Sequence, residues 1–191
     1  MYNVKLMVEG GGVDSSSIFV GWIPPYHDMG LIAGIIQTMV IGLHFIMFSP
    51  GDFIKNPPMW LEAISKYKAT HTAAPNFGYE LCIRKTLEDQ LEKYDLSSLK
   101  AAINGAEPVR EKTLVEFGKK FAPCGFKMEM WFPHYGMAEH TLYLCGRGPN
   151  LQESRILHLD AHALEFDKVV LAKEGGEDVV ALVSHGVPKK R

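Results

Sequence analysis

Cysteine is scarce in this sequence, and no cysteine has a near neighbour of its own kind. Cys82, Cys124 and Cys145 lie far apart, with no CxxC pair among them. Disulfide frameworks and structural zinc sites need closely patterned cysteines, so this spacing argues against both. We therefore expect reduced thiols and a cytoplasmic protein.

An excess of positive charge is also missing. The chain has 20 basic and 22 acidic residues, interleaved along its length, for a net charge of −2. Without a basic stripe, neither nucleic acid nor anionic lipid is an expected partner. The N-terminus lacks the basic-then-apolar pattern of a secretory signal. We predict that residues 1–19 form a flexible segment.

Long apolar runs are absent except for one, LIAGIIQTMVIGLHFIMF at residues 31–48. A membrane-spanning helix needs about 20 apolar residues, so this run is barely long enough. Gln37, Gly42 and His44 interrupt it. We favour a buried helix that ends near Gly42, followed by a short buried strand from His44 to Phe48, and expect no integral membrane protein.

Helical and β-rich segments alternate over residues 20–148. The segments MWLEAISKYKA, NFGYELCIRK and VREKTLVEFGKKFA have helical spacing, whereas THTAAP, LKAAI and KMEMWF are typical of strands. This alternation predicts an α/β fold with a mostly parallel sheet and flanking helices. The loops NGAEP and PHYGMAEH follow strands, and in such folds ligands bind where loops leave the carboxyl ends of strands.

The composition changes near Pro149. Residues 149–191 are β-rich, with a helical turn at AHALEF and a hairpin-like turn at GGED. The sequence stops at GVPKKR, directly after an expected strand. We therefore predict three parts, residues 1–19, 20–148 and 149–191, and an incomplete domain.

Several polar residues could carry chemistry, although each also has a structural interpretation. His27 and Asp28, within WIPPYHDMGL, could be an acid/base pair, metal ligands or lining of a substrate path, or could simply fix their loop. Glu107 and Glu139 could hold a divalent cation, or could be acids at helix N-termini. Tyr135 could offer an aromatic face to a planar base, but tyrosine before glycine is also common in turns.

The order of the motifs is more specific than any one of them. WIPPYHDMGL, PNFGYELC with Arg84, LKAAINGAEPV, FAPCGF and YGMAEHTL resemble the adenylate-forming (AMP-binding) superfamily, and most closely the fatty acyl-AMP ligases. The resemblance spans about residues 20–188. It implies the central part of the large N-terminal domain of such an enzyme.

The resemblance also implies roles for individual residues. The adenine of ATP or AMP would contact Asn104, Gly105, Ala106, Glu107, Pro108, Tyr135 and Gly136. Glu139 would bind the Mg²⁺ that bridges the ATP phosphates. The acyl pocket would be lined by His27, Met29, Gly30, Asn76 and Phe77, with His27 near the acyl carboxylate and Asp28 supporting its loop.

The implied activity is the activation of a fatty acid with ATP to an acyl-adenylate. The tail resembles the insertion that, in fatty acyl-AMP ligases, restrains the small C-terminal domain, so that an acyl carrier protein accepts the acyl group. A fatty acyl-CoA ligase of the same superfamily, or a non-catalytic module that binds a nucleotide or an acyl chain, is the alternative.

The sequence also departs from the family pattern. No phosphate-binding loop precedes WIPPYHDMGL, since GGGVDSSS lies too close to it and lacks the threonines and the lysine. The ribose-binding aspartate, the hinge and the catalytic lysine would lie beyond Arg191. Without these groups we expect no turnover by the isolated chain.

Overall fold

A seven-stranded sheet forms the body of the computed structural model, which describes residues 1–146, 155–173, 176 and 178–188. The strands lie in the order β2, β1, β3, β4, β5, β6, β9. Their bounds are β1 (Ile18–Gly21), β2 (His44–Met47), β3 (His71–Ala74), β4 (Ala101–Asn104), β5 (Trp131–Gly136), β6 (Tyr143–Gly146) and β9 (Val187–Pro188). Neighbours from β2 to β5 pair in parallel, and β6 and β9 add antiparallel pairs. The predicted mostly parallel α/β sheet is thus confirmed.

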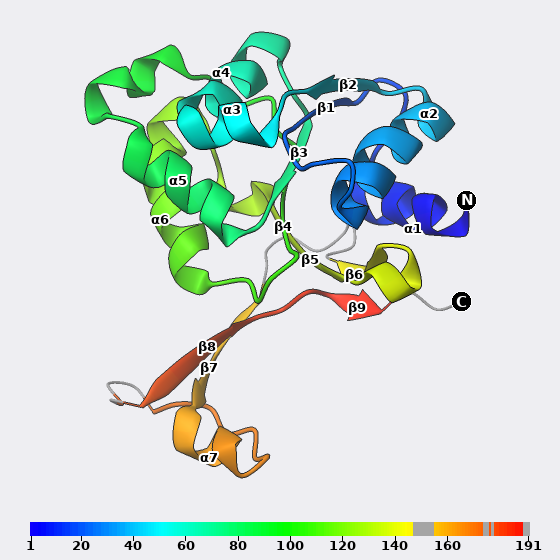
Figure 1. Ribbon diagram of the computed structural model, residues 1–191. Coiled ribbons are helices and arrows are strands. Elements are labelled where there is room, and N and C mark those ends of the chain that lie inside the picture. The colour runs from blue at the N-terminus through cyan, green and yellow to red at the C-terminus, as the bar shows by residue number, and fades with distance from the viewer. Residues whose placement is uncertain (147–154, 174–175, 177, 189–191) are drawn as a thin grey trace.

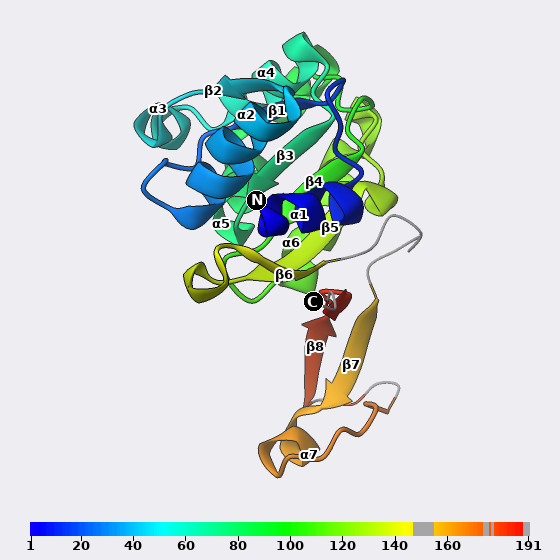
Figure 2. The same ribbon diagram turned by 90° about the vertical axis from the view of Figure 1, so that its right-hand side faces the viewer.

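Helices cover both faces of the sheet (Figures 1 and 2). The α-helices are α1 (Tyr2–Gly11), α2 (Gln37–Ile41), α3 (Pro50–Lys55), α4 (Pro58–Tyr67), α5 (Asn76–Lys85), α6 (Glu111–Phe121) and α7 (Ala161–Glu165). The shorter or irregular helices are the π-helical η1 (Met29–Ile36) and the 3₁₀ helices η2 (Glu88–Lys93), η3 (Ala122–Cys124), η4 (Met128–Met130) and η5 (Ala138–His140). One core lies under α4, α5 and α6, and the other under α1 and η1.

The helices α4, α5 and α6 form where the sequence spacing predicts them. In α6, Leu114, Phe117 and Phe121 are buried on one face, while Lys112 and Glu116 point outward. In the opposite layer, η1 and α2 together end at Gly42, whose φ of 77° suits glycine. The predicted helix that stops near Gly42 is therefore confirmed, but it is buried on one face only, because Leu31, Met39 and Val40 are exposed. No helix among the described residues is long and apolar enough to cross a membrane.

Two expectations about the first 50 residues are wrong. Residues 2–11 form α1 rather than a flexible segment, because Val4 and Met7 are buried against the sheet. The strand after Gly42 is not buried, because β2 is the edge strand of the sheet and leaves His44 and Met47 exposed.

The residues around β7, α7 and β8 form an arm that extends away from the body (Figures 1 and 2). Its strands β7 (Ile156–Asp160) and β8 (Val179–Val183) pair in antiparallel register, which agrees with the expected β-rich tail. The arm meets the body where Val183 joins the core and His158 lies 2.8 Å from Glu111. The boundary expected at residues 148–149 and part of the turn expected at 175–178 lie outside the described residues, so the predicted three-part division remains a prediction.

Asn3 holds α1 to the sheet, and this contact is testable. The side-chain nitrogen of Asn3 donates to the backbone carbonyl oxygen of Tyr143 at 2.8 Å. Its side-chain oxygen accepts from the backbone nitrogen of Tyr143 at 3.0 Å. We expect Asn3→Ala to lower the free energy of unfolding by about 1–2 kcal/mol, because both bonds are lost together with a weaker one from the same amide nitrogen to the His140 carbonyl oxygen at 3.3 Å. Chemical denaturation measures this change, and hydrogen exchange of residues 2–11 should accelerate.

Lys5→Ala is the matched control, because Lys5 is exposed on the same helix. It should leave stability and exchange nearly unchanged. Equal effects of the two substitutions would contradict the anchoring role of Asn3.

Candidate functional site

Four strand ends bring the predicted site residues to one edge of the sheet. Strands β1, β3, β4 and β5 run parallel, so their carboxyl ends lie together. The segments that follow them begin at Trp22, Pro75, Gly105 and Met137. The crevice expected at this edge therefore has a structural basis.

The loop after β1 is fixed by its own polar side chains. His27 Nδ1 lies 2.8 Å from Asp28 Oδ1, and the Met29 amide donates to both groups, at 3.1 and 2.7 Å. Asp28 thereby caps the start of η1. Gly30 lies against the carbonyl oxygens of Ile23 and Pro24, where a Cβ would collide. The imidazole of His27 stays half-exposed in the crevice.

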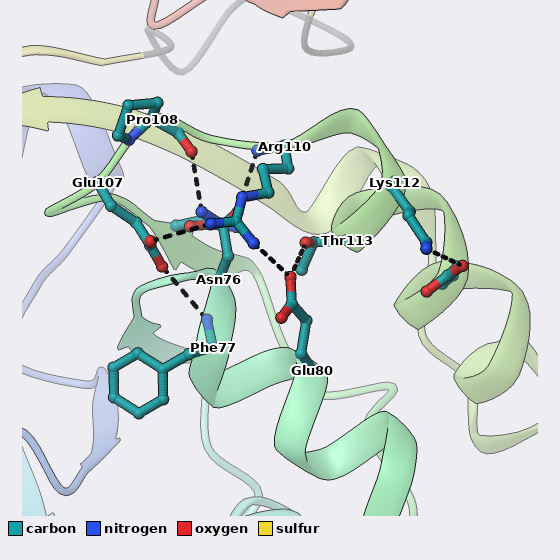
Figure 3. A network of polar contacts seen from close by, with 10 residues as sticks. Asn76, Phe77, Glu80, Glu107, Pro108, Arg110, Lys112 and Thr113 are labelled. Atoms are coloured by element: carbon teal, nitrogen blue, oxygen red, sulfur yellow. Dashed lines mark hydrogen bonds and ion pairs between the residues drawn. The ribbon is translucent and has the colours of Figure 1, made fainter.

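Asn76, at the start of α5, organises the neighbouring loop (Figure 3). Its side-chain nitrogen donates to the backbone carbonyl oxygen of Pro108 at 2.9 Å. Its side-chain oxygen accepts from Asn104 Nδ2 and from the backbone nitrogen of Arg110, both at 3.1 Å. Asn76 is fully buried and lines neither cleft described below, whereas its neighbour Phe77 does line one. Asn76 therefore lies behind the loop instead of on the wall of the expected acyl pocket.

Glu107 lies at the N-terminus of α5, although α6 is the helix that follows it in the sequence. Its carboxylate accepts from the Phe77 amide of α5 at 3.3 Å, where the helix dipole favours negative charge. Arg110 lies 3.8 Å from Glu107 and 3.3 Å from Glu80, and Glu80 also accepts from Thr113 at 2.7 Å (Figure 3). This network ties the loop to α5 and α6.

Ala106 has a φ of 66°, a left-handed conformation that is unusual for alanine. It is exposed, and it lines two adjacent clefts. The strain therefore occurs where the loop faces a potential ligand, which is typical of functional loops.

Two clefts and one pocket meet at this edge. The polar cleft, of about 130 Å³, is lined by His27, Asp28, Met29, Ala106, His134, Gly136 and Leu142. The outer cleft, of about 370 Å³, is lined by Trp22, Ile23, Pro24, His27, Met29, Pro75, Phe77, Ala106 and Glu107. An apolar pocket of about 40 Å³ lies between α1, η1 and the sheet, and it shares Met29, His134 and Leu142 with the polar cleft.

His134 is a site residue that the sequence analysis missed. It lies on β5 and is buried, and its Nδ1 has no hydrogen-bond partner among the described residues. Burial, with a smaller contribution from His185, lowers the pKa of His134 to about 4, so the imidazole is neutral at pH 7. A histidine at the end of a buried strand, within the loop motif PHYGMAEH, was the available sign.

Other expected site residues fall outside the clefts. Gly105 packs against the ring of His134, where a Cβ would lie 2.8 Å from Cε1, and Asn104 is buried behind it. Tyr135 is half-exposed and faces His185, with ring centroids 6.4 Å apart. Neither Tyr135 nor Glu139 lines the polar or the outer cleft, so the structure does not bring them together with His27.

The described part of the chain does not assemble a metal site around Glu139. This residue is exposed, beside a groove that it shares with Tyr2, Asn3 and Thr141. Among the described residues, no group of three or more His, Cys, Asp or Glu side chains could hold a metal ion. A single carboxylate would suit only a magnesium ion held mainly by phosphates and water. The assignment of Mg²⁺ to Glu139 therefore remains a prediction.

The fold and clefts define an α/β protein with clefts at the carboxyl edge of parallel strands, which is where such folds bind ligands. More specifically, the family described as "AMP-binding enzyme" matches residues 1–163. The chain belongs to this family of AMP-binding enzymes, which confirms the resemblance seen in its motifs.

Individual relatives refine this assignment. The chain is 39% identical over 190 residues to a medium-chain-fatty-acid–[acyl-carrier-protein] ligase, JamA, of Moorena producens. The match covers 98% of this chain and 32% of that protein. It is 36% identical over 188 residues to 4-hydroxyphenylalkanoate adenylyltransferase of Mycobacterium tuberculosis. That match covers 97% of this chain and 30% of the relative.

A solved structure has the same fold. The fatty acid AMP ligase from Legionella pneumophila superposes with a TM-score of 0.93 at 38% identity, over 98% of this chain and 32% of that one. A second structure of a fatty acyl-adenylate ligase from L. pneumophila, in complex with acyl adenylate and pyrophosphate, matches equally well, with a TM-score of 0.93. The chain therefore spans about a third of the length of these relatives.

The role of Asn76 in holding the loop can be tested by substitution. We expect Asn76→Ala to lower the free energy of unfolding by about 3 kcal/mol, because Pro108 and Asn104 lose a buried partner. Urea denaturation measures the change. Lys112→Ala is the control, since its 3.8 Å ion pair with Glu116 is on the surface and should contribute less than about 1 kcal/mol. A small loss for Asn76→Ala would contradict its role.

The lowered pKa of His134 predicts a dependence of stability on pH. The unfolded chain, in which a histidine has a pKa of about 6.5, binds more protons than the folded chain between about pH 6.5 and pH 4, so stability falls as the pH falls through this window. Between pH 7 and pH 5 we expect the wild type to lose about 2 kcal/mol more than His134→Gln. Denaturation series at both pH values measure this difference, and parallel losses would contradict a buried neutral imidazole.

Proposed function

We propose that this chain carries part of the substrate cleft of a ligase that joins a fatty acid to AMP. In the proposed reaction the carboxylate oxygen of the fatty acid attacks the α-phosphorus of ATP. A new bond forms between this oxygen and phosphorus, and pyrophosphate leaves. The fatty acid needs no general base, because its carboxyl group is already ionised at pH 7.

The observation that carries the proposal is the meeting of a polar cleft with an apolar pocket. Met29 and Leu142 line both spaces. A fatty acid has an apolar tail and a charged head, so it suits a site where these two environments adjoin. The names of the relatives, a fatty-acid–acyl-carrier-protein ligase and a fatty acid AMP ligase, support the same substrate class.

The nucleotide side of the site is proposed on the loop from Gly105 to Pro108. Ala106, which is exposed, and Gly136 both line the polar cleft, and neither has a long side chain to fill it. Magnesium, if bound with ATP, would supply positive charge at the phosphates, with Glu139 as the proposed ligand. Transfer of the acyl group to an acyl carrier protein is supported by the names of two relatives.

Substitution of Ala106 tests whether a nucleotide phosphate lies at this loop. Asn and Asp both tolerate the left-handed backbone of this position, and they differ in charge but little in shape. We expect Ala106→Asp to bind octyl-AMP, an unreactive ester with a negative phosphate, about tenfold more weakly than Ala106→Asn, through repulsion between like charges. Isothermal titration calorimetry measures both affinities.

The wild-type chain must first bind octyl-AMP saturably. A folded chain that binds neither octyl-AMP nor a fatty acid would refute the proposed cleft. Equal affinities of Ala106→Asn and Ala106→Asp for octyl-AMP would show that its phosphate does not lie at this loop. They would not contradict the binding of a fatty acid.

A further inference from the structure

Among the residues that the structure describes, His134 is the one polar side chain shared by the apolar pocket and the polar cleft. The two spaces have Met29, Leu142 and His134 in common, and the first two are apolar. The ring lies at the end of β5, against Gly105 at the end of β4. A hydrogen-bonding group therefore lies at the boundary between an apolar and a polar environment.

The burial of this ring without a partner needs a physical explanation. Nδ1 of His134 is inaccessible and makes no hydrogen bond within the described residues. A buried polar atom left in this state costs about 1–3 kcal/mol, so such atoms are rare unless a ligand or an ordered water satisfies them. Because Nδ1 is closed off beside Gly105, only Nε2 is left to hydrogen-bond a molecule in the cleft, and a neutral imidazole can carry its one proton on that nitrogen.

The surroundings favour an anionic oxygen as the partner of His134 Nε2. A fatty acid whose tail enters the apolar pocket has its carboxylate at the boundary, where His134 lies. Asp28 also lines the polar cleft, but its Oδ1 already accepts from the Met29 amide, 2.7 Å away at the start of η1. Its negative charge is thereby stabilised locally.

We propose that His134 donates a hydrogen bond to the carboxylate of the acyl substrate, and so selects acids over neutral molecules with the same tail. This assignment rests on the proposed function and deepens it. The bond places the carboxylate at the inner end of the polar cleft, whose opposite wall includes Ala106. No covalent change occurs at His134.

Tyr143 offers a matched control. Its hydroxyl is also buried without a partner, and its ring also lines the apolar pocket, 6.1 Å from the ring of His134. Tyr143 does not line the polar cleft, and its hydroxyl instead faces Gly10 and Gly146. Removal of this hydroxyl should leave the recognition of a carboxylate intact.

The test compares octanoate with octan-1-ol, which has the same tail but no carboxylate. Calorimetry on the wild-type chain should show tighter binding of octanoate. His134→Phe should weaken octanoate at least about tenfold and leave octan-1-ol unchanged, because a charge-assisted hydrogen bond is lost while the apolar wall remains. His134→Gln, which keeps an N–H donor, should restore most of the selectivity, and Tyr143→Phe should retain all of it.

A measurement on the wild type alone covers the case in which the variants misfold. With ¹⁵N-labelled histidine, the ring nitrogen signals of His134 should shift when octanoate is added, and should not shift with octan-1-ol. The role of His134 would be refuted if octanoate bound without shifting these signals, or if a folded His134→Phe bound octanoate as tightly as the wild type. Either result would leave the proposed function standing. Failure of the wild type to bind both octanoate and octyl-AMP would instead count against the proposed function.

Discussion

Parallel pairing of β1, β3, β4 and β5 is the constraint on which the site depends. Each strand is four to six residues long and pairs in register with the next, so their carboxyl ends finish at one edge. The loops at that edge must then share one crevice, although they come from positions far apart in the sequence. Asn76 reinforces this arrangement, because one buried amide joins the start of α5 to the end of β4 and to the loop before α6.

Polar groups with no partner gather around the crevice. Among the described residues, the buried nitrogens of Trp22 and His134 lack hydrogen bonds, and both side chains line a cleft. Such groups reduce stability unless a ligand or water satisfies them. The strained backbone of Ala106 occurs in the same place. These local costs are tolerable because two aromatic-rich cores on either side of the sheet stabilise the rest of the chain.

Secondary structure was largely predictable, and the errors have physical causes. The apolar spacing of α4 and α6 and the stop at Gly42 were sufficient to locate those helices. The helix at residues 2–11 was missed because its glycine-rich end and short apolar stripe give a weak pattern, and its stability comes from contacts with β6 such as those of Asn3. The sequence predicts a buried strand at β2, because three of its four residues are apolar. Its exposure is decided by its place at the edge of the sheet.

The sequence by itself determined the family, the parallel α/β fold and the loops at the ligand edge, because motif order and apolar periodicity are local properties of the chain. Only the tertiary structure decided which residues of those loops face the crevice. Successive residues on a strand point to opposite faces, so His134 lines the polar cleft while its neighbour Tyr135 faces His185. Likewise Asn76 is buried behind the loop while Phe77, one residue later, lines the outer cleft, because a helix turns about 100° per residue.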